Sequence, residues 1–263
     1  MTKDIGEILG IMQDKKVFIF GTSPQISDLF LTPYGLEIIS DTSVKHKNRK
    51  GSCVLENVVI NLPEDKRQKL RDIFNGKFNS NDIITMGVNY FSCYFPVDIA
   101  FWGDIASKAM TREILNKSEA WFKCSLDNVT NIYKEEINYD ALTHTFKWLG
   151  SHSDKIDFRT CDLPTEYSGY LWWWRTGVLG AIHMAAMAGA SHIIVSGVEW
   201  NPCSADHFYE DSNKDNVFGW VDAETITQTE KFLTTFPDIK FIKTSETSYL
   251  PFEFMELDDC LNE

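Results

Sequence analysis

The stretch RTGVLGAIHMAAMAGASHIIVSGVEWNPCSADHFYED, residues 175–211, predicts an α/β fold. Residues 176–177 begin a helix that carries small residues on one face and ends at Gly189. The β-branched run His192 to Ser196 then predicts a short buried strand, and Gly197 starts a polar loop. Because ligands of open parallel sheets bind beyond the carboxyl ends of the strands, we expect this loop to face a substrate.

Strands and helices alternate in the pattern of the remaining sequence. Strands are expected at residues 16–20, 36–40, 53–62 (as a strand or a hairpin arm), 83–88, 97–102, 119–123, 156–159 and 239–244. Helices are expected at residues 24–31, 61–75, 105–116, 138–149 and 222–236. This alternation predicts one domain over residues 1–263, built as a Rossmann-like, doubly wound and mostly parallel sheet with helices on both faces.

The chain is acidic, with 25 lysine and arginine residues against 38 aspartate and glutamate residues and a net charge of -13. This charge repels a phosphate backbone, so nucleic acid is a disfavoured partner. The basic run at residues 45–50 is expected to be a solvated polar loop, with a phosphate-docking site as the alternative.

The sequence contains no run of the ~18 apolar residues that span a bilayer, and residues 1–10 lack the plan of a signal peptide. We therefore expect a soluble, cytoplasmic protein. The six cysteines are scattered without a CxxC pair, which argues against a zinc ribbon or a disulfide framework and predicts reduced thiols. Tryptophans fill positions 172–174 and cannot all face one core, so at least one is expected to line a pocket or an interface.

The turn GTSP at residues 21–24 follows the first expected strand. It lacks the three spaced glycines of a dinucleotide fingerprint and the lysine of a P-loop, which weakens the oxidoreductase and P-loop kinase interpretations. What remains is Gly21 with the hydroxyls of Thr22 and Ser23, a turn suited to contact a ribose or a phosphate through backbone amides and side-chain oxygens. An ordinary corner between a strand and a helix is the alternative.

Asn89 and Asp104 each follow the end of an expected strand. A carboxamide there can bind the edge of a base or a sugar, and a carboxylate can accept hydrogen bonds from hydroxyls or bind a divalent metal. Both residue types are also common turn formers. Arg175 stands before the helix that begins at Thr176 and Gly177, where backbone amides and the helix dipole favour an anion; a pair between Arg175 and a carboxylate is the alternative.

His207 is the candidate acid or base of the loop after residue 200. A neutral imidazole can take a proton from a hydroxyl nucleophile, and a neighbouring carboxylate such as Asp206 can orient it. A surface histidine is the alternative, and a metal site that includes Cys203 is disfavoured because the spacing is nonspecific. His183 and His192 are expected to be structural. The loop contributes Glu199, His207 and Asp211 as candidate catalytic residues, and Trp200 and Tyr209 as candidate binding residues.

The sequences GTSP at residues 21–24, GVN at residues 87–89 and TGV to GVEW at residues 176–200, with a histidine-containing loop after them, resemble the pattern of bacterial sialyltransferases that use CMP-sialic acid. They are similar, too, to a wider group of Rossmann-like proteins that includes archaeal hydroxymethylpterin diphosphokinases and phage and capsule-locus proteins. The resemblance covers fragments of the chain and implies a GT-A-variant-like fold in a phage or bacterial protein.

The resemblance also implies roles for individual residues. The nucleotide would be cradled by Gly21, Thr22, Ser23, Asn89, Thr176 and Gly177. A downstream histidine would be the general base, and His207 is the nearest match in loop position. The chain departs from the pattern where Thr22 replaces an asparagine, Ser23 a glycine, and the Glu199–Trp200 pair an Asp-Phe pair, so the nucleotide and the sugar stay open.

We hypothesise a glycosyltransferase-like enzyme that transfers a sugar from a nucleotide-sugar to an acceptor hydroxyl, which His207 deprotonates. Residues 201–221 would form an active-site loop or lid. The acceptor would be a glycan or a small molecule, with a modified nucleic acid disfavoured by the net charge. Arg175 and the helix start at Thr176 would stabilise the leaving phosphate, so no metal is required, although the pattern leaves room for Mg²⁺. The only co-substrate implied is the nucleotide-sugar.

Two other classes of function stay open. In an ATP-dependent diphosphokinase of the pterin type, Asp104, Glu199 and Asp211 would hold magnesium. In a non-catalytic nucleotide-sensing or interaction protein, the fold would be retained without the chemistry.

Overall fold

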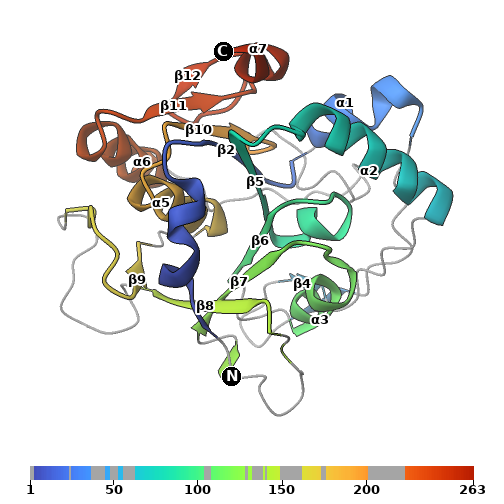
Figure 1. Cartoon of the computed structure of the whole chain (residues 1–263), viewed down its shortest axis with the longest axis horizontal. Helices are drawn as coiled ribbons and strands as arrows, with labels where there is room; N and C mark the ends of the chain where they lie inside the picture. Colours follow the sequence, from blue (N-terminus) through green and yellow to red (C-terminus); the bar gives the residue numbers. More distant parts are fainter. Residues whose placement is uncertain are drawn as a thin grey trace.

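A computed structural model of the chain describes residues 3–23, 25–36, 45–47, 53–55, 63–103, 108–127, 130–131, 139, 141–148, 162–172, 176–200 and 223–263 (Figure 1). The strands expected at residues 36–40 and 156–159 lie outside the described residues, apart from Leu36. The same holds for the loop or lid expected at residues 201–221.

One sheet joins ten of the described strands. These strands are β1 (Lys3–Asp4), β2 (Lys16–Phe20), β5 (Ile83–Val88), β6 (Ile99–Trp102), β7 (Phe122–Leu126), β8 (Thr143–Trp148), β9 (Tyr170–Leu171), β10 (His192–Ser196), β11 (Lys240–Lys243) and β12 (Glu253–Phe254). Their order is β1-β8-β7-β6-β5-β2-β10-β11-β12, with β9 paired to β8, and every one of these pairs is parallel.

Helices cover both faces of the sheet. They are η1 (Ile5–Met12), α1 (Gln25–Phe30), η2 (Thr32–Tyr34), α2 (Glu64–Phe78), η3 (Asn89–Cys93), α3 (Lys108–Lys117), α5 (Gly177–Met187), α6 (Ala223–Thr235) and α7 (Leu257–Asn262). Figure 1 shows η1, α5 and α6 on one side of the strands and α1, α2 and α3 on the other. The expected fold class, a doubly wound α/β sheet, is therefore confirmed.

Alternation along β2 separates two hydrophobic cores. Val17 and Ile19 pack beneath η1, α5 and α6, whereas Phe18 and Phe20 pack toward α1, α2 and η3. Successive side chains of a strand point to opposite faces, so a strand with apolar residues at every position must be covered on both sides. The second core is rich in phenylalanine, and the Phe20 ring stacks on Phe91 with the centroids 4.8 Å apart. The sequence KVFIF thus places β2 in the centre of the sheet.

The chain reverses its direction of growth across the sheet at β2. From β2 it proceeds through β5, β6 and β7 to β8, and it then returns through α5 to β10, on the opposite side of β2, and on to β11 and β12. The junction of β2 and β10 is therefore the topological switch point. In open parallel sheets, ligands bind in the crevice outside the carboxyl ends of the strands at this point.

The helix expected at residues 138–149 is wrong, because Thr143–Trp148 form strand β8. The segment THTFKW alternates β-branched and aromatic residues, which fit a pleated surface better than a helix. Phe146 is buried against Phe101 of β6, with ring centroids 4.8 Å apart. The strand expected at residues 119–123 is displaced, since β7 covers Phe122–Leu126.

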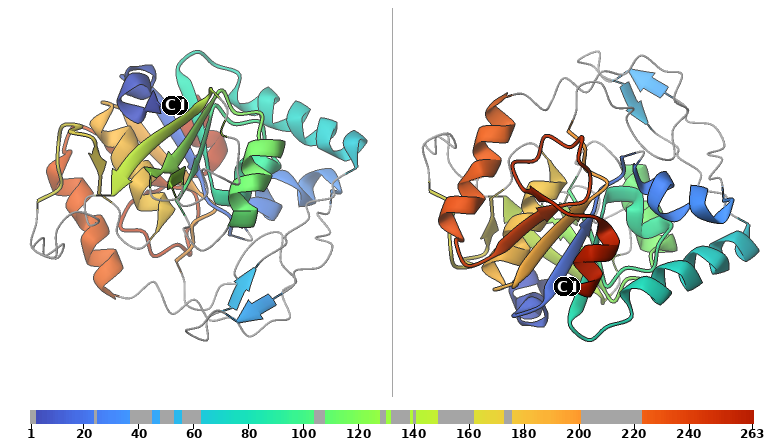
Figure 2. Two further views of the ribbon diagram at one scale, coloured as in Figure 1. Left: turned by 90° about the horizontal axis from the view of Figure 1, so that it is seen from below. Right: turned by 90° about the horizontal axis from the view of Figure 1, so that it is seen from above.

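The basic run at residues 45–50 is not a loop throughout. Lys45–Lys47 form strand β3, which pairs antiparallel with β4 (Cys53–Leu55) apart from the main sheet (Figure 2). Cys53–Leu55 thus form one arm of a hairpin, which is one of the two structures expected for residues 53–62. The remaining expected helices and strands that the structure describes are present, with bounds shifted by a few residues.

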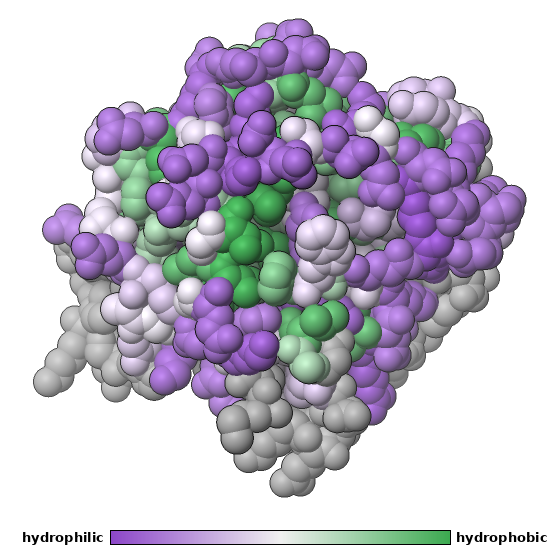
Figure 3. Space-filling model, viewed as in Figure 1, coloured by the Kyte–Doolittle hydropathy of each residue, from purple (hydrophilic) through white to green (hydrophobic). Residues whose placement is uncertain are grey.

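Hydrophilic residues cover much of the face seen in Figure 3, around a hydrophobic area near its middle. This distribution fits the acidic composition. Among the described helices, none has the length and apolar content needed to cross a membrane.

Candidate functional site

Two glycines bring the ends of β2 and β10 into backbone contact. The N–H of Gly21 donates to the Ser196 carbonyl over 2.8 Å, and the N–H of Ser23 donates to the Gly197 carbonyl over 2.9 Å. A Cβ on Gly21 would collide with the Gly197 carbonyl oxygen and lie 2.5 Å from Cγ2 of Val198. Gly197 has a φ of +66°, which favours glycine. Both glycines are buried, and a Cβ on Gly197 would lie 2.5 Å from Cδ1 of Ile26, so the turns after β2 and β10 pack too closely for a side chain at either position.

Gln25, the first residue of α1, joins three strand ends. Its Oε1 accepts the Gly197 N–H over 2.9 Å, and its Nε2 donates to the Thr244 carbonyl over 2.6 Å. The Ser196 and Thr244 hydroxyls lie 2.7 Å apart and complete the link between β10 and the end of β11. Sequence reasoning missed Gln25. A polar residue directly after the GTSP turn was the one signal for it.

A segment after β11 stands beside the corner that follows β10. Ser248 donates through Oγ to the Val198 carbonyl over 2.6 Å, and the Tyr249 N–H donates to the Glu199 carbonyl over 2.8 Å. Lys243 holds the segment from behind, because its Nζ donates to the carbonyls of Ser248 (2.6 Å) and Leu250 (3.1 Å). Residues 244–250, which the sequence did not single out, thus form one wall of the candidate site, the β11 wall.

Glu199 and Trp200 occupy the corner between β10 and the β11 wall. Burial, and then the nearby Asp28 carboxylate, raise the pKa of the Glu199 carboxyl. Its protonated form, which can donate a hydrogen bond, is therefore more favoured than in water. Trp200 has a φ of +47°, in the left-handed region that bulky residues avoid, and it packs against the core. Strained backbone of this kind is common at ligand sites.

Ser23 contributes a buried hydroxyl to the turn after β2. The residue is 9% exposed, and its Oγ has no hydrogen-bond partner among the described residues. Most buried polar groups are paired, and leaving one unpaired costs about 1–3 kcal/mol. Thr22, next to it, is also buried. An unpaired hydroxyl at the switch point is what a ligand oxygen or N–H would satisfy.

The start of α5 lies at the same edge of the sheet. Gly189, with a φ of +75°, turns the chain from the end of α5 toward the amino end of β10, so the helix runs back along the strands and begins at their carboxyl ends. Thr176 is the N-cap, and its hydroxyl accepts the Leu179 N–H over 3.4 Å. Gly177 is the first helical residue. The predicted start of the helix at residues 176–177 is thus confirmed, and the anion seat stays a prediction.

Asn89 follows β5 and is the first residue of η3. Its φ is +55°, a conformation that asparagine tolerates better than most residues. The turn is tight, since a Cβ on Gly87 would lie 2.9 Å from Cδ1 of Phe91. Asn89 is therefore a turn former, the alternative considered for it, at the carboxyl edge of the sheet.

Eight predicted site residues thus share the carboxyl edge. They are Gly21, Thr22, Ser23, Asn89, Thr176, Gly177, Glu199 and Trp200. Five others lie outside the described residues. They are Asp104, Arg175, His207, Tyr209 and Asp211. The proposed base and anion-binding arginine therefore stay predictions. No cluster of three His, Cys, Asp or Glu side chains suited to a metal occurs within the described part of the chain.

His183 and Trp172 support the site from within the core. His183 is fully buried, accepts the Trp172 N–H at Nδ1 over 2.8 Å, and lies 2.8 Å through Nε2 from the Pro164 carbonyl. This arrangement agrees with the structural role expected for His183. Trp172 is also fully buried, which makes it a core residue, and the next two tryptophans lie outside the described residues.

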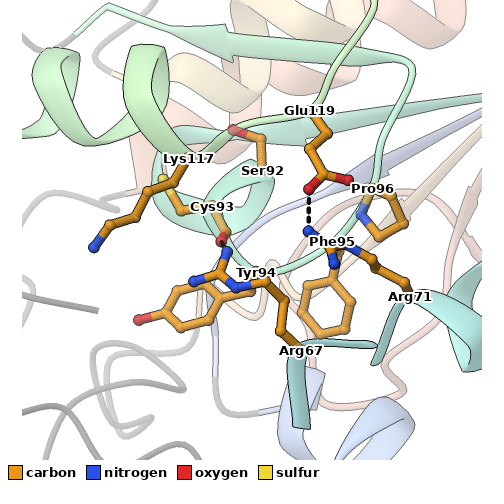
Figure 4. Close-up of a pocket in the computed structure, with 9 residues that line it drawn as sticks. All are labelled: Arg67, Arg71, Ser92, Cys93, Tyr94, Phe95, Pro96, Lys117 and Glu119. Atoms are coloured by element: carbon orange, nitrogen blue, oxygen red, sulfur yellow. Dashed lines mark hydrogen bonds and ion pairs between the residues drawn. The ribbon is translucent and has the colours of Figure 1, made fainter. Parts of the chain in front are cut away.

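A hollow of about 10 Å³ lies between α2, the segment after β5, and the end of α3 (Figure 4). Its cations are already engaged: Arg71 pairs with Glu64 (2.8 Å) and Glu119, Lys117 with Glu113 (2.6 Å), and Arg67 donates to the Cys93 carbonyl (3.3 Å). Lys117 and Glu119 precede β7, so the hollow faces away from the carboxyl edge. It is also smaller than the ~300 Å³ at which ligand pockets begin. We interpret it as a structural ion-pair cluster.

No family model matches the chain, and no curated protein resembles it in sequence. Among solved structures, the chain is similar to the sialyltransferase CST-II in complex with a trisaccharide acceptor and CMP. The alignment covers 93% of this chain and 88% of that chain, with a TM-score of 0.44 and 14% sequence identity. The chain's own residues therefore carry the case for its function.

Proposed function

We propose that the chain is a glycosyltransferase-like enzyme that binds a nucleotide-sugar beyond the carboxyl ends of β2 and β10. The observation that carries the proposal is the switch point itself, where Gly21 and Gly197 let the turns after β2 and β10 pack closely beside the buried, unpaired hydroxyl of Ser23. Ligands of open parallel sheets bind in the crevice at this point, where a hydroxyl such as that of Ser23 can donate to a phosphate oxygen or accept from a ribose hydroxyl. The start of α5 at the same edge supplies amides and a dipole that favour the phosphate.

The proposed reaction is a single displacement. An acceptor hydroxyl attacks the anomeric carbon of the sugar, a new C–O bond forms, and the bond between that carbon and the phosphate oxygen breaks. The hydroxyl proton passes to the imidazole of His207, and the nucleotide leaves with the electron pair on its phosphate. Arg175 and the first amides of α5 stabilise the negative charge of the leaving phosphate.

The sequence resemblance to sialyltransferases makes a cytidine nucleotide the first donor to test. The measurement is the shift in Tm on addition of CMP, UDP, GDP, ADP and their sugars, with and without Mg²⁺, because a ligand that binds only the folded state stabilises it. We expect a shift with one nucleotide and its sugar and transfer to an acceptor in the same buffer. No shift with any of them would remove the proposal, and binding that needs Mg²⁺ without sugar transfer would favour a diphosphokinase.

The base is tested separately by His207→Ala. We expect transfer to fall by about a hundredfold or more while nucleotide binding is kept, since general base catalysis contributes roughly 10²–10⁴ in rate. The matched control is His192→Ala, a histidine at the amino end of β10 and thus at the opposite edge of the sheet, which should transfer at the parent rate. Equal rates in both variants would exclude His207 as the base.

A further inference from the structure

Tyr249 lies on the β11 wall, next to the corner that holds Glu199. Its N–H donates to the Glu199 carbonyl over 2.8 Å, and the side chain is 53% exposed. The residues before and after it are fixed, because Ser248 and Leu250 are buried and Lys243 binds both of their carbonyls. The backbone at Tyr249 is therefore held in place while its ring remains accessible.

Packing does not account for this tyrosine. The neighbouring Leu250 and Phe252 enter the core, where Phe252 lies 5.2 Å from Phe241 between ring centroids. Tyr249 leaves about half of its surface exposed and thus gains only part of what a core aromatic residue gains from the hydrophobic effect. A fixed and accessible aromatic ring beside a ligand crevice is instead a surface for stacking, with little conformational entropy to lose on binding.

The groups around Tyr249 fit a nucleobase. A base offers a planar face for stacking, and its edge carries both donors and acceptors of hydrogen bonds. The carbonyl of Glu199 binds the Tyr249 N–H. The Glu199 carboxyl, when protonated, can both donate to and accept from the edge of a base, and when ionised it accepts from an N–H donor. The phosphate seat lies at α5 and the Gly21 turn, so the base would extend toward the β11 side of the switch point.

We propose that Tyr249 is the base-stacking residue of the nucleotide site and that the β11 wall is its base subsite. The inference rests on the proposed function and goes beyond it, because it names the nucleobase as the part of the donor that the β11 half of the sheet binds. The residue acts on binding and takes no part in the transfer step.

The test compares nucleoside monophosphates with the same molecule without its base. Isothermal titration measures the Kd of CMP, UMP, AMP, GMP and ribose 5-phosphate for the parent protein, Tyr249→Ala and Tyr249→Phe. The matched control is Tyr34→Ala, which removes a tyrosine that is 37% exposed in η2. We expect Tyr249→Ala to weaken the best nucleotide about five- to a hundredfold, the usual size of base stacking, and to leave ribose 5-phosphate unchanged. Tyr249→Phe should keep the parent Kd within about threefold, since it keeps the ring.

The outcomes separate the two proposals. Suppose that the parent protein binds a nucleotide. The role of Tyr249 alone would then be overturned if Tyr249→Ala bound that nucleotide equally well, or if it lost affinity for ribose 5-phosphate to the same extent. Parent protein that binds no nucleotide would overturn the proposed function and the base subsite together. Circular dichroism confirms that each variant is folded. Where Tyr249→Ala does not fold, Tyr249→Leu takes its place, because leucine keeps apolar bulk without an aromatic face, and it should weaken the nucleotide in the same way.

Discussion

Acidification should destabilise the protein through His183. The imidazole is fully buried, with Nδ1 accepting the Trp172 N–H and Nε2 bound to the Pro164 carbonyl, each over 2.8 Å. Nδ1 is an acceptor in this arrangement, so the neutral ring fits and a second proton would break the bond to Trp172. Burial lowers the pKa of His183 from 6.5 to about 4, although the Pro164 carbonyl raises it in part.

The magnitude follows from linkage. His183 takes up its proton near pH 6.5 in the unfolded chain and near pH 4 in the folded one. Its contribution to stability is therefore fully present above pH 6.5 and is lost as the pH falls toward 4. Each pKa unit corresponds to about 1.4 kcal/mol, so the full loss is roughly 3 kcal/mol, of which about 2 kcal/mol has gone at pH 5.

The assay is urea unfolding, followed by circular dichroism at pH 7.5 and pH 5, of the parent protein and of His183→Gln. Glutamine can offer an acceptor and a donor without titrating, so the variant removes the His183 contribution and keeps those of the carboxylates. The parent protein should lose about 2 kcal/mol more than the variant between the two pH values. An equal loss in both proteins would refute the reasoning.

Ser23 and Gln25, on either side of Pro24 after β2, should respond in opposite ways. Gln25→Ala should destabilise the free protein by about 1–3 kcal/mol in urea unfolding, because it leaves the Gly197 N–H and the Thr244 carbonyl without their side-chain partner. A loss below about 0.5 kcal/mol would contradict the role of Gln25 as a link between these strand ends. Ser23→Ala should leave the free protein as stable or slightly more stable, since its hydroxyl is buried and unpaired, while weakening nucleotide binding; a marked loss of stability would show that the hydroxyl is structural.

Much of the fold could be predicted because local patterns agree with it. Runs such as KVFIF and HIIVS are apolar at nearly every position, as strands covered on both faces must be, and Gly189 ends α5 by its left-handed backbone. The strand β8 could not be predicted in this way because THTFKW lacks such an apolar run. Its pairing with β7 and the burial of Phe146 decide the outcome, and both are long-range effects.

The same distinction applies to the site. Strand ends in a parallel sheet converge, so the turns after β2 and β10 could be placed at one edge from their sequence. Gln25, Lys243 and Tyr249 could not, because their roles depend on the pairing of β10 with β11, which brings together segments almost fifty residues apart. No local motif marks them. They come to lie at the candidate site because the fold brings Thr244 beside Ser196.

The strained backbone at Trp200 is held by contacts within the protein. A bulky residue with a φ of +47° is held there by bonds on its N-terminal side, since the carbonyls of Val198 and Glu199 are bound by Ser248 and Tyr249. Such strain costs about 1–3 kcal/mol and persists only where surrounding contacts fix it. Because these contacts come from the β11 wall, the free energy of binding need not order the corner. The wall therefore both maintains the strain at Trp200 and presents Tyr249, which links the stability of this corner to the affinity of the site.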